Sequence, residues 1–420
     1  MSKFVAVKRM PLTPQLAHRR SLADQRLAAG KDEANGAKRE LLQSIGLTPM
    51  PAGAWSPLLH HTFKPLPYLK AYVVDAPNPA VAERARDLLE PEYVVVPNLV
   101  LSLPPPTFDR RYLRRPRAYS GWPEASGIAQ AHQQGIQGQG VLVGVLDTGC
   151  DADHLEFRNQ QIDFRYVPLD PTVDGVRTCR GFDVDGHGTH VCGIIAGQNV
   201  GVAPQAELMV ASVIESETLR TSLERVVIAL NGMLAEIQLE KNLQKPAIIN
   251  ISLGFLPEWI NATQIEAMSR GMQQILNTLL IDYNVLPIVA IGNDGPGRMR
   301  APAYFPEALS VGAVDRALVP ARFSGSGRPV LTPLWEPDIA GYGVDILSSL
   351  ERQVDGRSVY ALASGTSMAA PYVAGIAALA ASADPTLQGE MLRQHLLTGA
   401  LPIADERNRV GTGLARFVGT

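Results

Sequence analysis

The chain has 420 residues, of which 46% are hydrophobic and 19% charged, and its formal net charge is −3 at pH 7. This composition is typical of a globular protein and excludes a fibrous or largely disordered chain. The small net charge gives no general attraction to nucleic acid or to an anionic membrane, so we expect neither as a partner. No apolar run approaches the roughly 18–20 residues that span a bilayer.

The first residues, MSKFVAVKRMPLTPQ, lack the charged start, apolar core and small-residue cleavage site of a secretory signal. Three cysteines, Cys150, Cys179 and Cys192, are too few for a disulfide framework, and an odd number cannot all pair within the chain. We therefore expect reduced thiols and a cytoplasmic protein, with non-classical export as the alternative.

Residues 1–103 have the pattern of a small α+β domain. Four stretches read as strands, namely Lys3–Lys8, His61–Lys64, Tyr68–Val74 and Tyr93–Val96. Two stretches have helical spacing: Ala37–Ile45, which ends at Gly46 as a natural C-cap, and Pro79–Leu89, which has proline near its first turn. The order β-α-β-β-α-β predicts a ferredoxin-like, split-βαβ domain.

From about Ser120 the pattern changes, and continuous apolar runs alternate with helical stretches. This alternation predicts a mainly parallel sheet covered by helices on both faces, a three-layer α/β/α domain over residues 120–420. In such sheets the functional groups gather at the carboxyl ends of the strands. Polar residues stand there in this sequence: Asp147 follows VLVGVL, Ser252 follows AIINI and Asn293 follows VLPIVAIG.

Three blocks carry residues used in nucleophilic catalysis: Asp147 in VLDTG, His187 in DGHGTHVCG and Ser367 in ASGTSMAAPYVAG. A serine nucleophile needs a base within hydrogen-bond reach, and the base needs a carboxylate that holds its tautomer. Ser367 opens a helix of small residues, so its own backbone N–H can help to stabilise an oxyanion. Asn293 can supply a side-chain N–H for the same purpose.

Five segments, VGVLDTG, DGHGTHVCGIIAG, NISLG, IGNDG and GTSMAAPYVAG, closely resemble the subtilisin-like serine proteases and occur in that family's order. The resemblance covers roughly Ser120 to Arg416 and implies a subtilisin-like fold for this part of the chain. It implies that Asp147 orients His187, that His187 acts as general base and then acid, that Ser367 is the nucleophile, and that Asn293 lines the oxyanion hole.

The same resemblance implies how a peptide substrate binds. Ser252, Leu253 and Gly254 are expected to form the strand that pairs with the substrate backbone, with Gly292 as a further substrate-binding residue. The expected partner is therefore a protein or peptide substrate.

The N-terminal domain also resembles the family's inhibitory propeptide. KFVAVKR matches the first strand of that propeptide, AKRELLQSIG its first helix, and VAERARDLLEPEYVVVPN its last helix and strand. The resemblance implies that residues 1–103 inhibit the protease within the same chain and that LVLSL lies in the active-site cleft. An unrelated α+β accessory domain is the alternative.

Residues 104–119 read as a proline- and arginine-rich linker with candidate processing sites. Pro104 makes the Leu103–Pro104 bond a tertiary amide and restricts Leu103, and three prolines in a row favour the extended polyproline II form. We expect this bond to survive and any cut to fall between Thr107 and Tyr119.

No metal or other cofactor is expected. Many subtilases bind calcium in a loop after the histidine-bearing helix, but here IIAGQNVGVAPQAEL has no long insertion, and only Glu156 offers a carboxylate at the other usual positions. A zinc site between Cys179 and Cys192 is disfavoured because the spacing fits no CxxC-type pattern. GIQGQGVLVG is no dinucleotide fingerprint, since its glycines precede the strand.

The sequence thus predicts a serine endopeptidase made as a zymogen, with an intracellular processing role favoured over broad digestion. The alternative from another class is a catalytically silent relative that binds peptides. Arg298 or Arg300 is a candidate to face the substrate and favour acidic residues just before the cleaved bond, although solvated arginines are the simpler interpretation.

Overall fold

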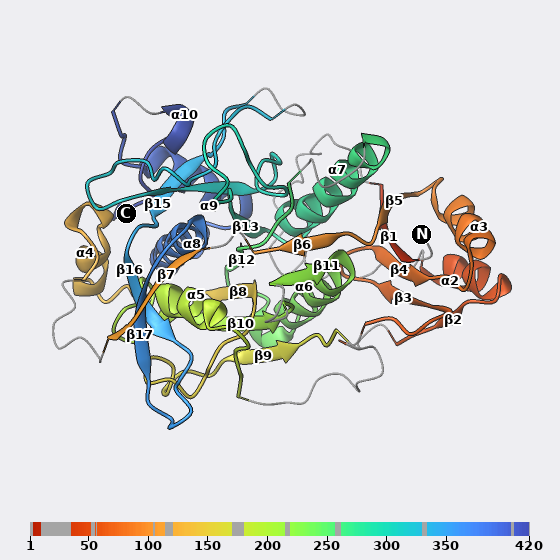
Figure 1. The fold of residues 1–420 in the computed structure, drawn as a ribbon, viewed down its shortest axis with the longest axis horizontal. Helices are drawn as coiled ribbons and strands as arrows, with labels where there is room; N and C mark the ends of the chain where they lie inside the picture. Colours follow the sequence, from red (N-terminus) through yellow and green to blue (C-terminus); the bar gives the residue numbers. More distant parts are fainter. Residues whose placement is uncertain are drawn as a thin grey trace.

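The chain folds into a small N-terminal sheet packed against a larger α/β unit (Figure 1). The computed structural model describes residues 3–419 except residues 10–34, 52–54, 56, 104–105, 114–120, 170–179, 215–218, 257–261, 330–333 and 405–406. Cys179 and most of the arginine-rich part of the predicted linker lie outside the described residues.

The N-terminal sheet has the strand order β2-β3-β4-β1-β5. Its strands are β1 (Lys3–Lys8), β2 (Thr48–Pro49), β3 (Thr62–Leu66), β4 (Ala71–Asp75) and β5 (Tyr93–Pro97), and its helices are α2 (Asn35–Ser44) and α3 (Pro79–Leu89). The chain order β-α-β-β-α-β is the expected one, with β2 as an additional short strand.

The alternation of β1 explains how this sheet is buried on both sides. Successive side chains of a strand point to opposite faces. Phe4 and Ala6 pack with residues of α2 and α3, whereas Val5 and Val7 pack with residues of two helices of the larger unit, α6 (Leu223–Ile237) and α7 (Ala262–Asn277). The inner face of the small sheet is therefore an interface with the rest of the chain.

The larger unit is built on a sheet of order β15-β14-β13-β12-β8-β10-β9, and every neighbouring pair is parallel. Its strands are β8 (Leu142–Asp147), β9 (Asp163–Tyr166), β10 (Glu207–Ser212), β12 (Ala247–Ile251), β13 (Val285–Ala290), β14 (Leu309–Val314) and β15 (Ile339–Tyr342). The remaining helical elements are η1 (Glu124–Ser126), α4 (Ile128–Gln133), α5 (His187–Ala196), η2 (Glu240–Asn242), η4 (Thr278–Asp282), α8 (Thr366–Ala383), α9 (Gly389–Gly399) and α10 (Arg407–Val410).

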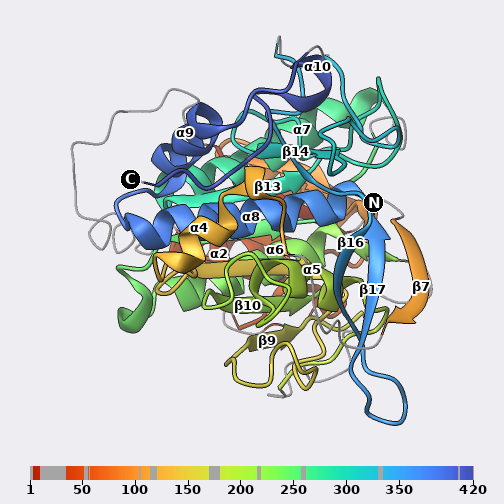
Figure 2. The ribbon, with the colours of Figure 1, turned by 90° about the vertical axis from the view of Figure 1, so that its left-hand side faces the viewer.

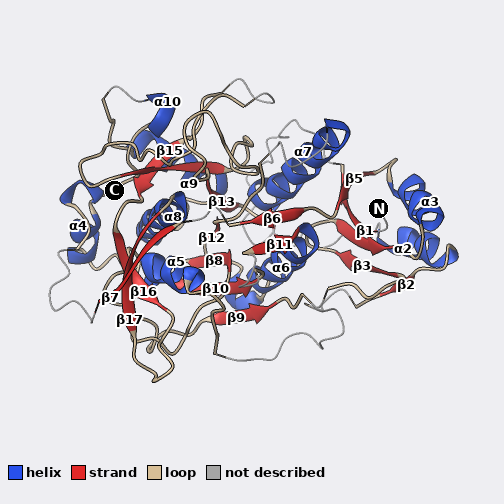
Figure 3. Ribbon diagram, in the orientation of Figure 1, coloured by secondary structure: helices blue, strands red, loops and turns tan. Residues whose placement is uncertain are grey.

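Helices cover both faces of this sheet (Figure 3), which confirms the three-layer α/β/α prediction. Residues of α5 and α8 share one buried cluster with β8, β13 and β14, and residues of α6 and α7 share another with β8, β12 and β13. The strand β8 is central, and the chain continues from it to strands on both sides. Its carboxyl end is therefore the place where a crevice for ligands is expected.

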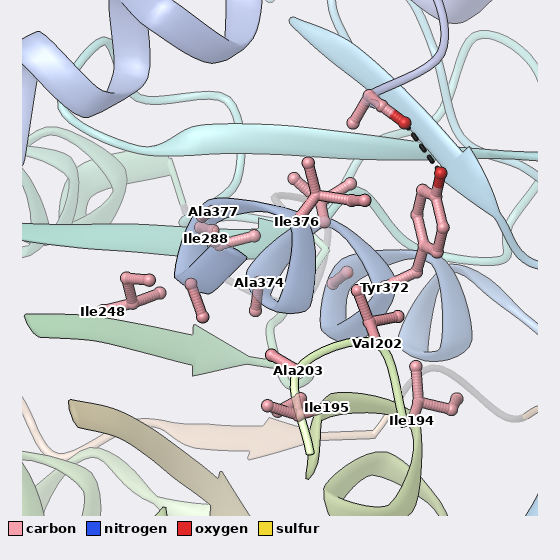
Figure 4. Close-up of a cluster of buried hydrophobic side chains, with 14 of the residues drawn as sticks. Ile194, Ile195, Val202, Ala203, Ile248, Ile288, Tyr372, Ala374, Ile376 and Ala377 are labelled. Carbon is pink, nitrogen blue, oxygen red and sulfur yellow. Dashed lines mark hydrogen bonds between the residues drawn. The ribbon is translucent and has the colours of Figure 1, made fainter. Parts of the chain in front are cut away.

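The small-residue helix α8 runs through the core (Figures 2 and 4). A Cβ on Gly375 would lie 2.7 Å from Val202 Cγ1, so the close approach requires glycine. Tyr372 donates its hydroxyl to the Ala415 carbonyl at 2.8 Å. Among the described residues, α8 is the only helix that is long and apolar enough to cross a membrane, whereas no apolar run of that length was expected from the sequence. Because 89% of α8 is buried within the protein, it is a core helix.

Two small antiparallel sheets use the segment that follows the N-terminal domain. Strand β6 (Val100–Ser102) pairs with β11 (Arg220–Ser222), and β7 (Thr107–Leu113) joins β16 (Ile346–Leu350) and β17 (Val359–Ser364). Figure 2 shows β7 alongside β17 at one side of the molecule. Part of the predicted linker is therefore a strand. Local sequence does not reveal this pairing, because the partner edge lies some 250 residues away.

Glu224, in the first turn of α6, anchors the small sheet to the larger unit. Its carboxylate accepts hydrogen bonds from Leu58 N at 2.6 Å and Lys3 Nζ at 2.9 Å, and its backbone N–H donates to Asn98 Oδ1 at 2.9 Å. Burial lowers the pKa of neighbouring Lys64 to about 8, although the charge of Glu224 opposes this shift. A carboxylate that is 3% exposed thus balances two lysines at the interface.

Replacing Glu224 with alanine is expected to lower stability by roughly 3 kcal/mol, because it removes a buried carboxylate from two lysines and leaves Leu58 N without its acceptor. Thermal unfolding would measure the effect. The control is Glu207→Ala, which removes an exposed pair with Lys245 and should change stability by less than about 1 kcal/mol. Equal shifts in the two variants would contradict the anchoring role of Glu224.

Candidate active site

Asp147 and His187 meet in the interior at the carboxyl end of the parallel sheet. Asp147 is the last residue of β8 and His187 the first of α5, and both are fully buried. His187 Nδ1 lies 2.7 Å from Asp147 Oδ1. Burial disfavours a charged imidazole, but the charge and hydrogen bond of Asp147 outweigh it, so the pKa of His187 is raised above its usual value. This pair is suited to accept a proton and hold it.

Glycines allow the two elements to come this close. Gly186 precedes α5 with a φ of +97°, a conformation that other residues rarely adopt. A Cβ on Gly188 would overlap the backbone of Gly149, two residues after Asp147. Gly188 is therefore required by the contact between the start of α5 and the residues that follow β8, and Gly186 by its own backbone conformation.

Asp183 positions this contact and was not recognised in the sequence analysis. One carboxylate oxygen accepts hydrogen bonds from Thr148 Oγ1 at 2.7 Å and from Gly186 N at 3.0 Å. The other accepts from Thr189 N and Thr189 Oγ1, both at 2.6 Å. Asp183 thus caps α5 and ties it to the residue after Asp147. An acidic residue shortly before a helix start was the signal that could have identified it.

Ser367 is the second residue of α8, after the N-cap Gly365. Its side chain is fully buried, and its hydroxyl has no hydrogen-bond partner among the described residues. The backbone N–H groups of a helix's first turn have no acceptor within the helix. The hydroxyl of Ser367 therefore stands beside donors that an oxyanion can use.

Asn293 is held against the start of the same helix. Its Oδ1 accepts hydrogen bonds from Thr366 N at 2.8 Å and Thr366 Oγ1 at 2.9 Å. Because a backbone N–H can only donate, the amide oxygen must face Thr366, and the amide nitrogen is directed elsewhere. The backbone N–H of Gly292, at a φ of +108°, donates to Thr366 Oγ1 at 3.2 Å, so Gly292 shapes this loop.

The predicted substrate strand is occupied by the chain's own residues. Ser102 N donates to Gly254 O at 2.9 Å, and Gly254 N donates to Ser102 O at 3.0 Å. Leu103 N donates to Leu219 O at 3.1 Å on the opposite side. Residues 100–103 thus form the middle strand between β11 and Gly254. Of the other predicted substrate-binding residues, Leu253 is 2% exposed and Ser252 accepts a hydrogen bond from Asn250.

His190, Cys150 and Cys192 lie near the pair of Asp147 and His187, whereas Cys179, the other cysteine of the disfavoured zinc site, lies outside the described residues. Burial lowers the pKa of His190 to about 3, and its Nε2 lies 3.1 Å from the Ala361 carbonyl, so it stays neutral. Cys150 and Cys192 are both buried free thiols, and burial together with the adjacent Cys192 raises the pKa of Cys150. Within the described part of the chain, no group of three or more His, Cys, Asp or Glu side chains is arranged to hold a metal ion.

The donor pattern around Glu156 does not fit the calcium ligand found in many subtilases. Its carboxylate accepts hydrogen bonds from Tyr360 Oη at 2.6 Å and from Asn199 Nδ2 at 3.0 Å on one oxygen, and from Asn199 N at 2.7 Å and Val200 N at 3.3 Å on the other. A calcium ligand must turn its oxygens toward the ion. Here four N–H and O–H groups occupy them.

A chelator is therefore expected to leave the melting temperature unchanged, to within about 1 °C, because the Glu156 carboxylate holds no ion that a chelator could remove. Glu156→Ala should lower stability by roughly 3 kcal/mol, since it leaves buried donors without acceptors. Thermal unfolding with and without chelator checks both statements, and Glu240→Ala, at the exposed start of η2, is the control. A large chelator effect would contradict the hydrogen-bonded role of Glu156.

Comparisons with known proteins show the family of this chain. Residues 138–420 match the model of the subtilase family, peptidase S8. Subtilisin-like protease PopC of Myxococcus xanthus (strain DK1622) is 44% identical over 371 residues, which cover 85% of this chain and 77% of PopC. The major intracellular serine protease of Bacillus subtilis (strain 168) is 29% identical over 69% of this chain and 86% of that protein. Subtilisin Savinase of Lederbergia lenta is 32% identical over a region that covers 68% of this chain and 91% of Savinase. The chain belongs to the subtilase family and is a subtilisin-like serine endopeptidase.

Proposed function

We propose that this endopeptidase cleaves peptide bonds through an acyl-enzyme on Ser367 and is made as a zymogen that its own N-terminal residues inhibit. The observation that carries the catalytic assignment is the buried hydrogen bond between His187 Nδ1 and Asp147 Oδ1. A carboxylate at Nδ1 leaves Nε2 as the nitrogen that exchanges a proton with the nucleophile.

The proposed mechanism follows from these positions. His187 takes the proton of the Ser367 hydroxyl as that oxygen attacks the peptide carbonyl, and Asp147 stabilises the resulting imidazolium. The oxyanion forms beside the first turn of α8, where the N–H of Ser367 and the amide of Asn293 donate hydrogen bonds to it. His187 then protonates the leaving amine, and water releases the acyl group by the same steps in reverse.

The proposed inhibition rests on the path of residues 100–113. Backbone hydrogen bonds hold Ser102 and Leu103 on one side of the cleft, and β7 pairs with β17 on the other, beginning with Thr107 opposite Ser364. Every peptide bond from Leu103 to Pro106 has proline on its leaving side. Such a tertiary amide has no N–H and is conformationally restricted, so we propose that the bound segment resists cleavage.

Activation would then require a cut outside the cleft. We propose that this cut lies between Thr107 and Tyr119 and, within that range, after Leu113. Residues Thr107–Leu113 are paired in strand β7, so they would have to leave that strand before a protease could bind them as an extended substrate.

Activity inside the cell on a restricted set of proteins is the role we propose. The intracellular serine proteases among the relatives support the location, including that of Paenibacillus polymyxa, which is 33% identical over 66% of this chain.

Asp147→Asn is expected to reduce kcat by about 10⁴-fold, because the neutral amide no longer stabilises the imidazolium or holds its tautomer. Without Asp147, burial, the largest influence on His187, is opposed only by the charges of Asp185 and Asp183, so its pKa should fall. His187 works as a base only when neutral, so the acidic limb of the kcat/KM profile should also move to lower pH. Both the loss of kcat and the shift of the pH profile would be measured by peptide hydrolysis, with enzyme that has been cleaved between Thr107 and Tyr119. Asp355→Asn, in an exposed loop, should match wild type.

Ser367→Ala tests the nucleophile and the route of processing together. Wild type should react with a fluorophosphonate at Ser367 after the cut, whereas Ser367→Ala should not. Intact mass and N-terminal sequencing of both proteins should show any self-made cut in wild type only, between Thr107 and Tyr119. A mature N-terminus at Pro104 would contradict the proposed inhibition. Absence of labelling in cut wild type would favour a silent, peptide-binding relative.

A further inference from the structure

Arg300 closes the loop that carries Asn293, and its side chain is held in one position. The residue is 4% exposed, and its backbone N–H donates to Ile291 O at 2.9 Å. A Cβ on Gly254 would lie 3.1 Å from Arg300 Cβ, and a Cβ on Gly292 would lie 2.9 Å from Arg300 Cγ. The arginine stem therefore runs against two glycines, one in the proposed substrate strand and one beside Asn293.

The guanidinium group is oriented by Asp294. Arg300 Nε donates to Asp294 Oδ2 at 2.7 Å, and Nη2 donates to Asp294 Oδ1 at 3.0 Å. This two-bond arrangement fixes the plane of the group. It leaves Nη1 to donate to Ser102 Oγ at 3.1 Å. Ser102 is the residue whose backbone pairs with Gly254.

We propose that Arg300 is a specificity-determining residue, which selects a hydrogen-bond acceptor at the substrate residue that pairs with Gly254. Serine, threonine, asparagine and aspartate carry such an acceptor. Because guanidinium N–H groups only donate, an apolar side chain there would leave Nη1 without this acceptor, and lysine or arginine would bring a second positive charge against it. The proposal rests on the proposed function, since it assumes that substrates bind as residues 100–103 do.

This assignment differs from the expectation drawn from the sequence. Arg298 is exposed, and the charge of Arg300 is balanced by Asp294. The side chain that Arg300 contacts belongs to the residue paired with Gly254, and the antiparallel register brings the residue two places later opposite Ser252. Ser252 follows β12, beside the strand ends that carry Asp147 and Asn293. If the substrate residue opposite Ser252 is the one that Ser367 attacks, as the proposed function implies, the selected position is the third residue before the cleaved bond.

Hydrogen exchange in the full-length protein tests the contact without requiring catalysis. Ser102→Ala and Ser102→Lys remove the acceptor, so the amides of residues 102 and 103 should exchange about tenfold faster than in wild type. Ser102→Thr retains the acceptor and should exchange like wild type, as should the control Val100→Ala on the exposed side of the same strand. In an Arg300→Gln background, the Ser102 substitutions should no longer change the exchange rates of the amides of residues 102 and 103. Equal exchange in wild type, Ser102→Ala and Ser102→Lys would overturn the proposal.

Peptide hydrolysis by protein cut between Thr107 and Tyr119 tests the selectivity. Four peptides would differ only in the third residue before the cleaved bond, which is serine, aspartate, alanine or lysine. Serine and aspartate peptides should have a kcat/KM about tenfold above that of the alanine peptide, with lysine the poorest, and Arg300→Gln should level the series. Equal kcat/KM values of the wild-type enzyme for all four peptides would overturn the proposal. If no peptide is cut and Ser367 does not react with a fluorophosphonate, the proposed function fails, and the exchange experiment still decides the contact.

Discussion

The hydrogen bond between Asp147 and His187 imposes the strictest requirement on this structure, because it joins two side chains that are both removed from water. An isolated carboxylate in that position would be costly, and an isolated imidazole would stay neutral. The two groups come within 2.7 Å because β8 ends where α5 begins. That meeting point depends in turn on the parallel pairing of β8 with β10 and β12, on the glycines at positions 149 and 188, and on the cap that Asp183 provides.

Unpaired backbone groups at three separate places explain why the segment after the N-terminal domain adopts an extended form. Gly254, β11 and β17 offer backbone groups that need partners, and an added strand satisfies them whatever its side chains are. Residues 100–103 and 107–113 supply that strand on the two sides of the three prolines. Specificity must then come from side chains, of which Arg300 reaches the bound segment directly.

Buried charge also determines how the two sheets are joined. Glu224 lies at the start of α6, where the helix dipole favours a negative charge, and it receives donors from three separate segments of the N-terminal domain. Release of that domain would expose Lys3, Lys64 and Glu224 to water together. The interface therefore combines an apolar contact between β1, β5, α6 and α7 with a charged anchor whose members depend on one another.

The sequence by itself determined the fold class and the family of this protein, because unbroken apolar strands, helical spacing and the blocks around Asp147, His187 and Ser367 are local patterns. It also placed the expected elements of the N-terminal domain in their order. Only the tertiary structure decided the strand Thr107–Leu113, the cap by Asp183, the anchor at Glu224 and the direction of Arg300. Each of these depends on partners distant along the chain, such as Ser364 for Thr107 and Leu58 for Glu224. No local periodicity or spacing encodes such a contact, since it is set by which edges and buried charges the packed layers bring together.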